Sequence, residues 1–363
     1  MKKEKKNYVA VGGQALMEGI MMNGPKGRSI ALRLPDGSIE VTMREFSQLK
    51  DKYKICRVPI IRGIVGFVET LIFGYQCLMY SAEKTTLDTG DEEEELSKFD
   101  KWVLDHFGEK MMAFIGGVSA VLGLLLAFAL FVWMPSFLFD LTNNYIAYGA
   151  MAGFRAIFEG VIRIVIFVSY MYAVSKMKDI KRVFMYHGAE HKSIFCFESG
   201  EPMTVANVRK QIRFHPRCGT SFVFVIIILS ILLSSIIGVA FPVLTTIIPL
   251  WILIKLLIMP LVMGIGYEFI RYAGCHDNLF VKILSAPGLW MQRITTAEPT
   301  DDMIEVGIAA LMAGIEHPEE RMDPEEKKKL DAQKKNEAAK DSEDVEVIEE
   351  VIDVKEVASQ ENE

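Results

Sequence analysis

The chain has 363 residues, of which 51% are hydrophobic, and its formal net charge is −7. The hydrophobic residues concentrate between about residues 111 and 275, where several windows reach the ~20 apolar residues needed to cross a bilayer. This distribution disfavours a soluble globular protein, and the N-terminus has no apolar core before Gly12 that would indicate a cleaved secretory signal. The five cysteines are odd in number and show no spacing framework, which favours reduced thiols over disulfides.

Residues 1–58 are predicted to form a small β-rich unit. Residues 29–34 and 38–43 alternate between apolar and polar side chains, and Pro35-Asp36-Gly37 between them is typical of a turn. The preceding stretch GGQALMEGIMMNGPKG is rich in glycine and methionine. It indicates a loop whose backbone approaches another group closely.

Residues 59–110 are predicted to contain a helix and a linker. The helix, at 59–82, is long enough to cross a bilayer, but Arg62, Glu69 and three glycines interrupt its apolar character. An interfacial or re-entrant helix is therefore favoured over a span. The acidic residues 88–101 indicate a solvated linker.

Residues 111–315 are predicted to be a transmembrane core, so the fold class is a mainly α, polytopic membrane protein. About four transmembrane helices are expected, at Met112–Phe139, Ala150–Ser175, Ser221–Val239 and Val243–Tyr272. The short loops at 139–149 and 240–250 carry no Lys or Arg, whereas 176–217 carries nine. By the positive-inside rule, both termini and the 176–217 segment are cytoplasmic, and a further span at 59–82 would break this pattern.

Residues 316–363 form an acidic tail, which is predicted to be disordered. The tail holds 18 of the 47 acidic residues and 8 of the 40 basic ones, so the net charge indicates nothing about the substrate of the folded part. Its alternating segment VEVIEEVIDVKEV is the place where an unknown protein partner could pair with the chain.

The main chemical signal is the sequence His187-Gly188-Ala189-Glu190-His191. On a helix, residues three or four apart share a face, so the two imidazoles would point the same way with the carboxylate beside them. Such a pair can bind a divalent transition metal, zinc above all, while Glu190 acts as general base or as a further ligand. The alternative is a pair of surface histidines that make hydrogen bonds. Gly188 weakens the helix prediction.

A metal site needs a third ligand, and the segment that opens the third span supplies candidates. His215 is the first choice, and Cys218 is also of a suitable type. Glu198, on the connection between the two segments, is a weaker candidate. The alternative for His215 is a helix-entry residue before Pro216.

Charged residues at membrane depth are the remaining candidates. Arg155, Glu159 and Arg163 lie four apart on one face of the second span and must face protein or water. Glu268 and Arg271 lie three apart in the fourth span, either as a local ion pair or with Glu268 as a ligand or base beneath the histidines. No nucleotide-binding loop, zinc ribbon or nucleic-acid module is recognisable, so no nucleic-acid partner is expected.

Four motifs together resemble the YqhQ-like family of bacterial membrane proteins: GGQALMEGIMM, YHGAEHK, HPRCGTSF and SAPGLWMQRITTAEPTDD. The last of them also has the pattern of an amphipathic helix on the cytoplasmic surface, with Trp290 in the interface. The resemblance covers roughly residues 8–315. It implies a multi-pass protein of the bacterial plasma membrane and a metal role for His187, Glu190, His191 and His215.

Three functional hypotheses follow. The leading one is a metal-dependent hydrolase at the cytoplasmic face, which splits a peptide or lipid-derived bond. The second is a non-enzymatic scaffold or regulator that recruits partners through its cytoplasmic regions. The third is a transporter, for which the charges at Arg155, Glu159 and Arg163 are the only support.

Overall fold

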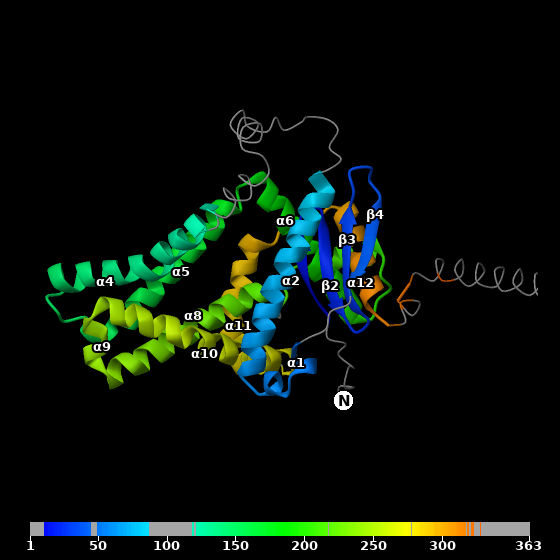
Figure 1. The fold of residues 1–363 in the computed structure, drawn as a ribbon. Helices are drawn as coiled ribbons and strands as arrows, with labels where there is room; N and C mark the ends of the chain where they lie inside the picture. Colours follow the sequence, from blue (N-terminus) through cyan, green and yellow to red (C-terminus); the bar gives the residue numbers. More distant parts are fainter. Residues whose placement is uncertain are drawn as a thin grey trace, which may run out of the picture.

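A computed structural model describes residues 11–44, 49–86, 121–216, 218–276 and 278–316, together with a few isolated positions. The predicted acidic linker at 88–101 and almost all of the predicted tail at 316–363 lie outside these residues. The molecule has two parts, an elongated bundle of apolar helices and a lobe that combines a small sheet with helices (Figure 1).

The lobe is built on a four-stranded antiparallel sheet, whose strands lie side by side in chain order. The two predicted strands are confirmed as β3 (Gly27–Arg33) and β4 (Ile39–Arg44). The glycine-rich stretch predicted as a loop instead forms β1 (Gly12–Leu16) and β2 (Gly19–Gly24). The prediction was wrong because the methionines and Ile20 of β2 are buried by tertiary contacts, which override the low strand propensity of glycine.

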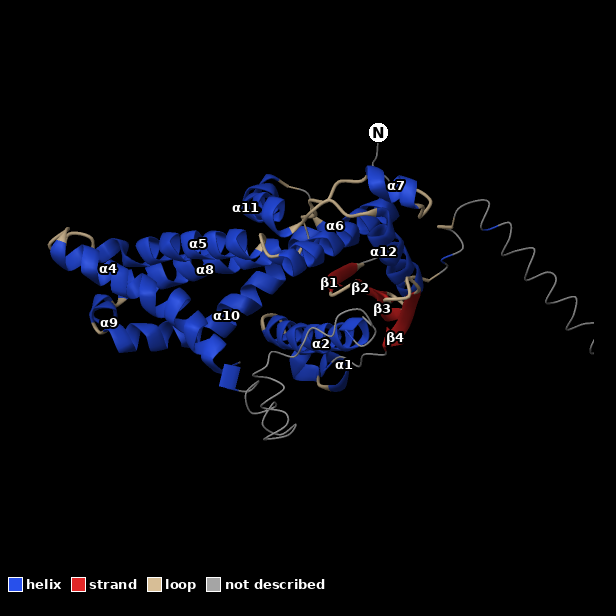
Figure 2. Ribbon diagram, turned by 90° about the horizontal axis from the view of Figure 1, so that it is seen from above, coloured by secondary structure: helices blue, strands red, loops and turns tan. Residues whose placement is uncertain are grey.

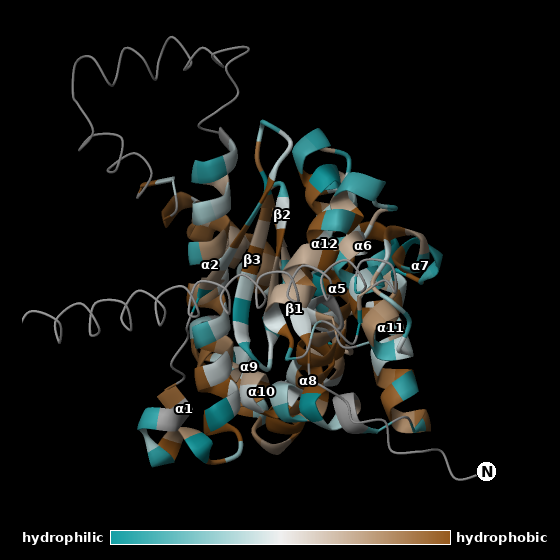
Figure 3. Cartoon of the chain, turned by 90° about the vertical axis from the view of Figure 1, so that its right-hand side faces the viewer, coloured by the Kyte–Doolittle hydropathy of each residue, from teal (hydrophilic) through white to brown (hydrophobic). Residues whose placement is uncertain are grey.

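Helices cover both faces of the sheet, as the view from the lobe end shows (Figure 3). One face packs on α6 (Lys178–Ser199) and α12 (Asp301–Gly314) and forms the main core, which contains Ile20, Met22 and Leu311. The other face packs on α2 (Ile61–Thr86) through Phe73 and Cys77. A methyl group on Gly24 would overlap the backbone of Gly314, so the expected close backbone approach does occur in this stretch.

The bundle contains the predicted spans, except that most of residues 112–120 of the first one lie outside the described residues. Its long helices are a stretch at Val121–Tyr145, whose last part is α4 (Met134–Tyr145), followed by α5 (Arg155–Val174), α8 (Gly219–Ala240) and α10 (Ile248–Cys275). The short α9 (Pro242–Thr246) precedes α10. A π-helical turn, Ala129–Trp133, precedes α4. Among the described residues, five helices are long and apolar enough to cross a membrane: Ile61–Thr85, Val121–Tyr145, Arg155–Val174, Phe222–Ala240 and Pro249–Ala273.

The first of these helices is α2, the segment predicted to be interfacial or re-entrant. It runs across the end of the bundle rather than along it (Figure 1), and it lies beside the end of α10 in the view from above (Figure 2). The remaining helices are short or lie in the lobe and at its junction with the bundle: α1 (Leu49–Lys52), α7 (Val205–Lys210), α11 (Leu279–Thr295) and 3₁₀ turns at Lys54–Arg57 and Ala152–Phe154.

Candidate metal centre

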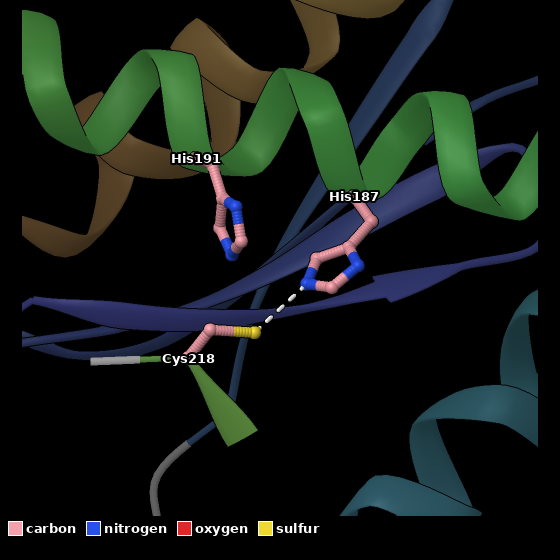
Figure 4. A group of neighbouring side chains, drawn as sticks. All are labelled: His187, His191 and Cys218. Carbon is pink, nitrogen blue, oxygen red and sulfur yellow. Dashed lines mark hydrogen bonds between the residues drawn. The ribbon is translucent and has the colours of Figure 1, made fainter. Parts of the chain in front are cut away.

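Helix α6 places His187 and His191 on one face, as the four-residue spacing predicts. Their ring centroids are 4.4 Å apart, and both rings project from the helix toward the start of α8 (Figure 4). The helix continues through Gly188 and ends at Gly200, which takes the left-handed conformation at the C-cap. The local sequence therefore presents two imidazoles to the same point in space.

Cys218 supplies a third donor from the N-cap of α8. Its Sγ lies 3.2 Å from Nε2 of His187, and the ligand atoms of His187, His191 and Cys218 all lie within 4.8 Å of one another. Zinc–nitrogen and zinc–sulfur bonds of about 2.0–2.3 Å require donors roughly 3.5 Å apart. The set therefore fits a tetrahedral ion after small side-chain movements.

His215, the first choice of the sequence analysis, lies beside this group rather than within it. Its ring centroid is 5.6 Å from that of His191, and its Nε2 is 3.8 Å from a carboxylate oxygen of Glu198. Burial lowers the pKa of His215 to about 4, so the ring is neutral near pH 7 and this contact is not an ion pair. The expected donor from the opening of α8 is present, but it is the thiol of Cys218.

Backbone carbonyls orient both imidazoles. Nδ1 of His187 lies 2.8 Å from the carbonyl oxygen of Thr295, and Nδ1 of His191 lies 2.5 Å from that of Arg213. Each Nδ1 therefore carries the proton and donates it, which leaves both Nε2 lone pairs for an ion. Such second contacts fix the tautomer and ring plane of metal-binding histidines. Burial also lowers the pKa of His191, which keeps the ring neutral.

Glu190 is buried next to the histidines. The backbone N–H of Gly13 donates to its carboxyl group, and the other oxygen, Oε2, has no hydrogen-bond partner among the described residues. Burial raises the pKa of the carboxyl group, with the nearby His187 and His215 opposing the shift. A buried polar atom of this kind is costly unless something binds it. Glu190 is therefore available to a water or to a ligand.

A cavity of about 550 Å³ surrounds these residues. Its wall includes β1 and β2, the middle of α2, and the ends of α5 and α8 at Met171 and Gly219. His187, Glu190, His191, His215 and Cys218 all line it. The candidate site is thus accessible from a space at the junction between lobe and bundle.

The segment 285–302 holds the site together, although its sequence predicted no site role for its residues. Gln292 on α11 accepts from the backbone N–H of His215 and donates to its carbonyl oxygen, both at 2.7 Å. Glu298 pairs with Lys192 of α6 and, at 3.1 Å, with Arg213. The only signal in the sequence was the resemblance motif that contains these residues.

Glu268 lies away from the histidines. Arg62 of α2 donates to both of its carboxylate oxygens, so Glu268 links α2 to α10. Arg271 lines a separate pocket with Arg57 and Arg62. The structure therefore brings neither Glu268 nor Arg271 to the candidate metal centre.

Glu159 is the centre of a buried charge cluster inside the bundle. Lys255 of α10 and Arg155 pair with it, Ser136 of α4 donates to it at 2.8 Å, and Arg163 lies 3.7 Å away. Asp140 on α4 holds Arg155 through two bonds of 3.0 and 3.1 Å. The charged face predicted from Arg155, Glu159 and Arg163 therefore faces protein, and Lys255 and Asp140, from two other helices, complete the cluster. Nε of Arg163 also donates to the carbonyl oxygen of Phe131, in the π-helical turn.

Comparison with known proteins places this architecture in a family without an assigned activity. The model of the family described as "Protein of unknown function (DUF1385)" matches residues 58–317. The chain is 34% identical over 307 residues to "Uncharacterized protein YqhQ" of Bacillus subtilis (strain 168), which covers 82% of this chain and 90% of that protein. No solved structure matches the chain significantly. The chain belongs to the YqhQ-like family, which the DUF1385 model describes.

Proposed function

We propose that the protein is a membrane-bound metalloenzyme, a hydrolase whose site lies at the cytoplasmic face. The observation that carries the proposal is the convergence of His187, His191 and Cys218 within 4.8 Å, with both Nδ1 atoms engaged by carbonyl oxygens. Three protein ligands leave one position of a tetrahedral ion open, which is the arrangement of catalytic rather than structural zinc sites. Zinc is favoured because it accepts imidazole and thiolate together.

Glu190 is the proposed general base. A bound ion would act as a Lewis acid and lower the pKa of a water toward about 7. Glu190 accepts a proton from that water and returns it to the leaving group, so one water is consumed for each bond that is split. The pKa of Glu190, raised by burial, brings its proton affinity closer to neutrality, which suits both steps.

The distribution of basic residues supports the cytoplasmic placement. The segment 176–217 holds nine Lys and Arg residues, and it carries His187, His191 and the residues just before Cys218. The loops 139–149 and 240–250, at the far end of the bundle, hold none. A multi-pass protein of the plasma membrane with both termini in the cytoplasm accounts for this asymmetry. The site would then lie just beneath the inner leaflet.

Elemental analysis of the purified full-length protein tests the proposal. We expect about one equivalent of a transition metal in the wild type and its loss in His187→Ala, His191→Ala and Cys218→Ala. The matched control is His276→Ala, because His276 is exposed, stacks on the ring of Tyr272 and hydrogen-bonds to the carbonyl oxygen of that residue. If the wild-type protein neither contains nor takes up zinc, manganese or iron, the proposal of a metalloenzyme is wrong.

A second candidate function rests on the 3.2 Å contact between Cys218 and His187. A thiol at a helix N-terminus beside an imidazole that is itself held by a carbonyl can act as a nucleophile without metal. A dyad of this kind requires a single base, whereas two oriented imidazoles here face one thiol. Alkylation by iodoacetamide separates the two functions: added zinc should protect Cys218 if the three residues bind metal and should have no effect on a dyad.

A further inference from the structure

Helix α2 carries an apolar stripe that no described residue covers. The side chains of Val68, Leu71, Ile72, Tyr75 and Met79 are all exposed, and their spacing of three and four residues places them on one face. The opposite face, with Phe73 and Cys77, packs on the sheet. A helix that is apolar on both faces is unfavourable in water, so the stripe requires an apolar neighbour.

The neighbours of α2 indicate the bilayer surface. Its first turns pack on the end of α10, where a methyl group on Gly63 would stand 2.9 Å from the carbonyl oxygen of Gly264. Phe67 contacts Phe222 at the start of α8. The helix thus begins beside the start of α8 and the later part of α10, and it runs across this end of the bundle (Figure 1).

A transmembrane position for α2 is excluded by its second half. There Lys84 pairs with Glu40 of β4 at 3.1 Å, and β4 is an edge strand of the sheet. If α2 crossed the hydrocarbon, this ion pair and the open backbone edge of β4 would enter it as well, at a high cost. An interfacial position buries the stripe and keeps the sheet in water.

A second helix at the same junction has a similar stripe. Leu279, Phe280, Ile283 and Trp290 of α11 are exposed, and α11 packs against α8 at the junction. On the same helix, Gln292 holds the backbone of His215 beside the candidate metal centre, and Thr295 orients His187 within it. The candidate site therefore lies between two helices whose outer faces suit the membrane interface.

The cavity connects α2 to the candidate metal centre. Thr70 and Phe73 of α2 line it on one side and the histidines on another. The guanidinium of Arg28 stands 4.2 Å from the ring centroid of Phe73. Arg28 is the only Lys or Arg among the described residues that line the cavity. It is a permanently charged donor suited to a phosphate or carboxylate group.

We propose that α2 lies in the cytoplasmic membrane interface and that the cavity takes an anionic lipid from the inner leaflet, with Arg28 binding its negatively charged group. The apolar walls of the cavity accommodate the acyl chains, the stripe on the opposite face of α2 lies in the surrounding interface, and the ligand site of His187, His191 and Cys218 faces the headgroup. As a substrate assignment this rests on the proposed function. The lipid binding itself depends on Arg28 and α2 and requires no metal.

Photocrosslinking tests the position of α2. The full-length protein is made with benzoylphenylalanine at Ile72 or, as the control, at Ile212, and is reconstituted in phosphatidylglycerol nanodiscs. Both side chains are similarly exposed, at 57% and 61%, but Ile212 lies in the lobe near α7. We expect lipid adducts at residue 72 and none at 212. A crosslink from residue 72 to a second copy of the chain, without lipid adducts, would overturn the proposal.

Lipid retention tests the cavity. Native mass spectrometry of the detergent-solubilised protein should show phosphatidylglycerol retained in at least tenfold preference to phosphatidylcholine, and inorganic phosphate alone should not compete. We expect Arg28→Gln to lose this preference, Arg28→Lys to keep part of it, and Thr70→Trp, which narrows the cavity, to lose retention altogether. Arg209→Gln is the control, because Arg209 is exposed in the lobe and pairs with Asp301.

The two proposals fail separately. His191→Ala should lose metal but retain phosphatidylglycerol. Retention that is unchanged in both Arg28→Gln and Thr70→Trp would overturn the lipid site even if the metal is present. Competition by inorganic phosphate at the same concentration would show a site for free phosphate and would also overturn it.

Discussion

The backbone of Gly188 lies directly against the carbonyl oxygen of Ala297, and a methyl group at residue 188 would overlap this oxygen. A neighbouring hydrogen bond aligns these two segments of the chain: the N–H of Ala297 donates to the carbonyl oxygen of Phe184 at 2.8 Å. Thr295, two residues earlier, orients His187. The glycine that weakens the helix prediction is therefore required by the site.

Gly188→Ala should destabilise the protein and lower its metal affinity. Helix propensity alone predicts a gain of up to about 1 kcal/mol. The overlap of the added methyl group with a fixed backbone atom should cost about 1–3 kcal/mol and outweigh this gain. Neither segment can move away without breaking the hydrogen bond between Ala297 and Phe184. The measurement is the thermal midpoint in detergent together with zinc content. Gly123→Ala is the control, since nothing lies within 4 Å of a methyl group there; equal effects in both variants would contradict the assignment.

Gln292→Leu should weaken the metal centre without touching a ligand. The variant removes two hydrogen bonds to the buried backbone of His215, each worth about 1–3 kcal/mol when the partner is left unsatisfied. The loop that presents Arg213 and Cys218 would then lose its anchor. We expect a lower unfolding midpoint and a zinc Kd raised at least tenfold, measured by competition with a chelator. An unchanged Kd would show that the loop is held by other contacts.

Glu159→Gln should strongly destabilise the bundle. The substitution leaves Lys255 and Arg155 buried, with Asp140 as the remaining carboxylate in the cluster. Removing one partner of a buried ion pair costs about 3–5 kcal/mol of folding free energy. The double variant Glu159→Gln, Lys255→Met removes one charge of each sign and should recover a large part of the loss. Unfolding midpoints of the four combinations measure the coupling. If the unfolding midpoint of Glu159→Gln equals that of the wild type, the cluster has no structural role, and a transport role is favoured instead.

Zinc should stabilise the metal-free protein. At a free concentration of 100 times Kd, binding to the folded state alone contributes about 2.7 kcal/mol. The rise in the unfolding midpoint should vanish in His191→Ala and persist in Glu190→Gln, because Glu190 is the proposed base and not one of the three ligands. Loss of the rise in Glu190→Gln would instead make Glu190 a metal ligand.

The sequence alone determined those features that depend on local spacing. Four bundle helices follow from the length of apolar runs, and the shared face of His187 and His191 follows from the period of the helix. The hairpin of β3 and β4 follows from alternation around a turn that contains Gly37. Each of these needs only residues close together in the chain.

The tertiary structure alone decided which distant residues complete each cluster. Cys218 rather than His215 reaches the two imidazoles, Arg62 rather than the histidines holds Glu268, and Lys255 joins Glu159. It also set α2 across the bundle end, whereas the charges and glycines of this segment indicated only that a simple span is disfavoured. The physical reason is common to all four cases: which side chains meet depends on how helices cross, and hydropathy and spacing along the chain carry no information about that.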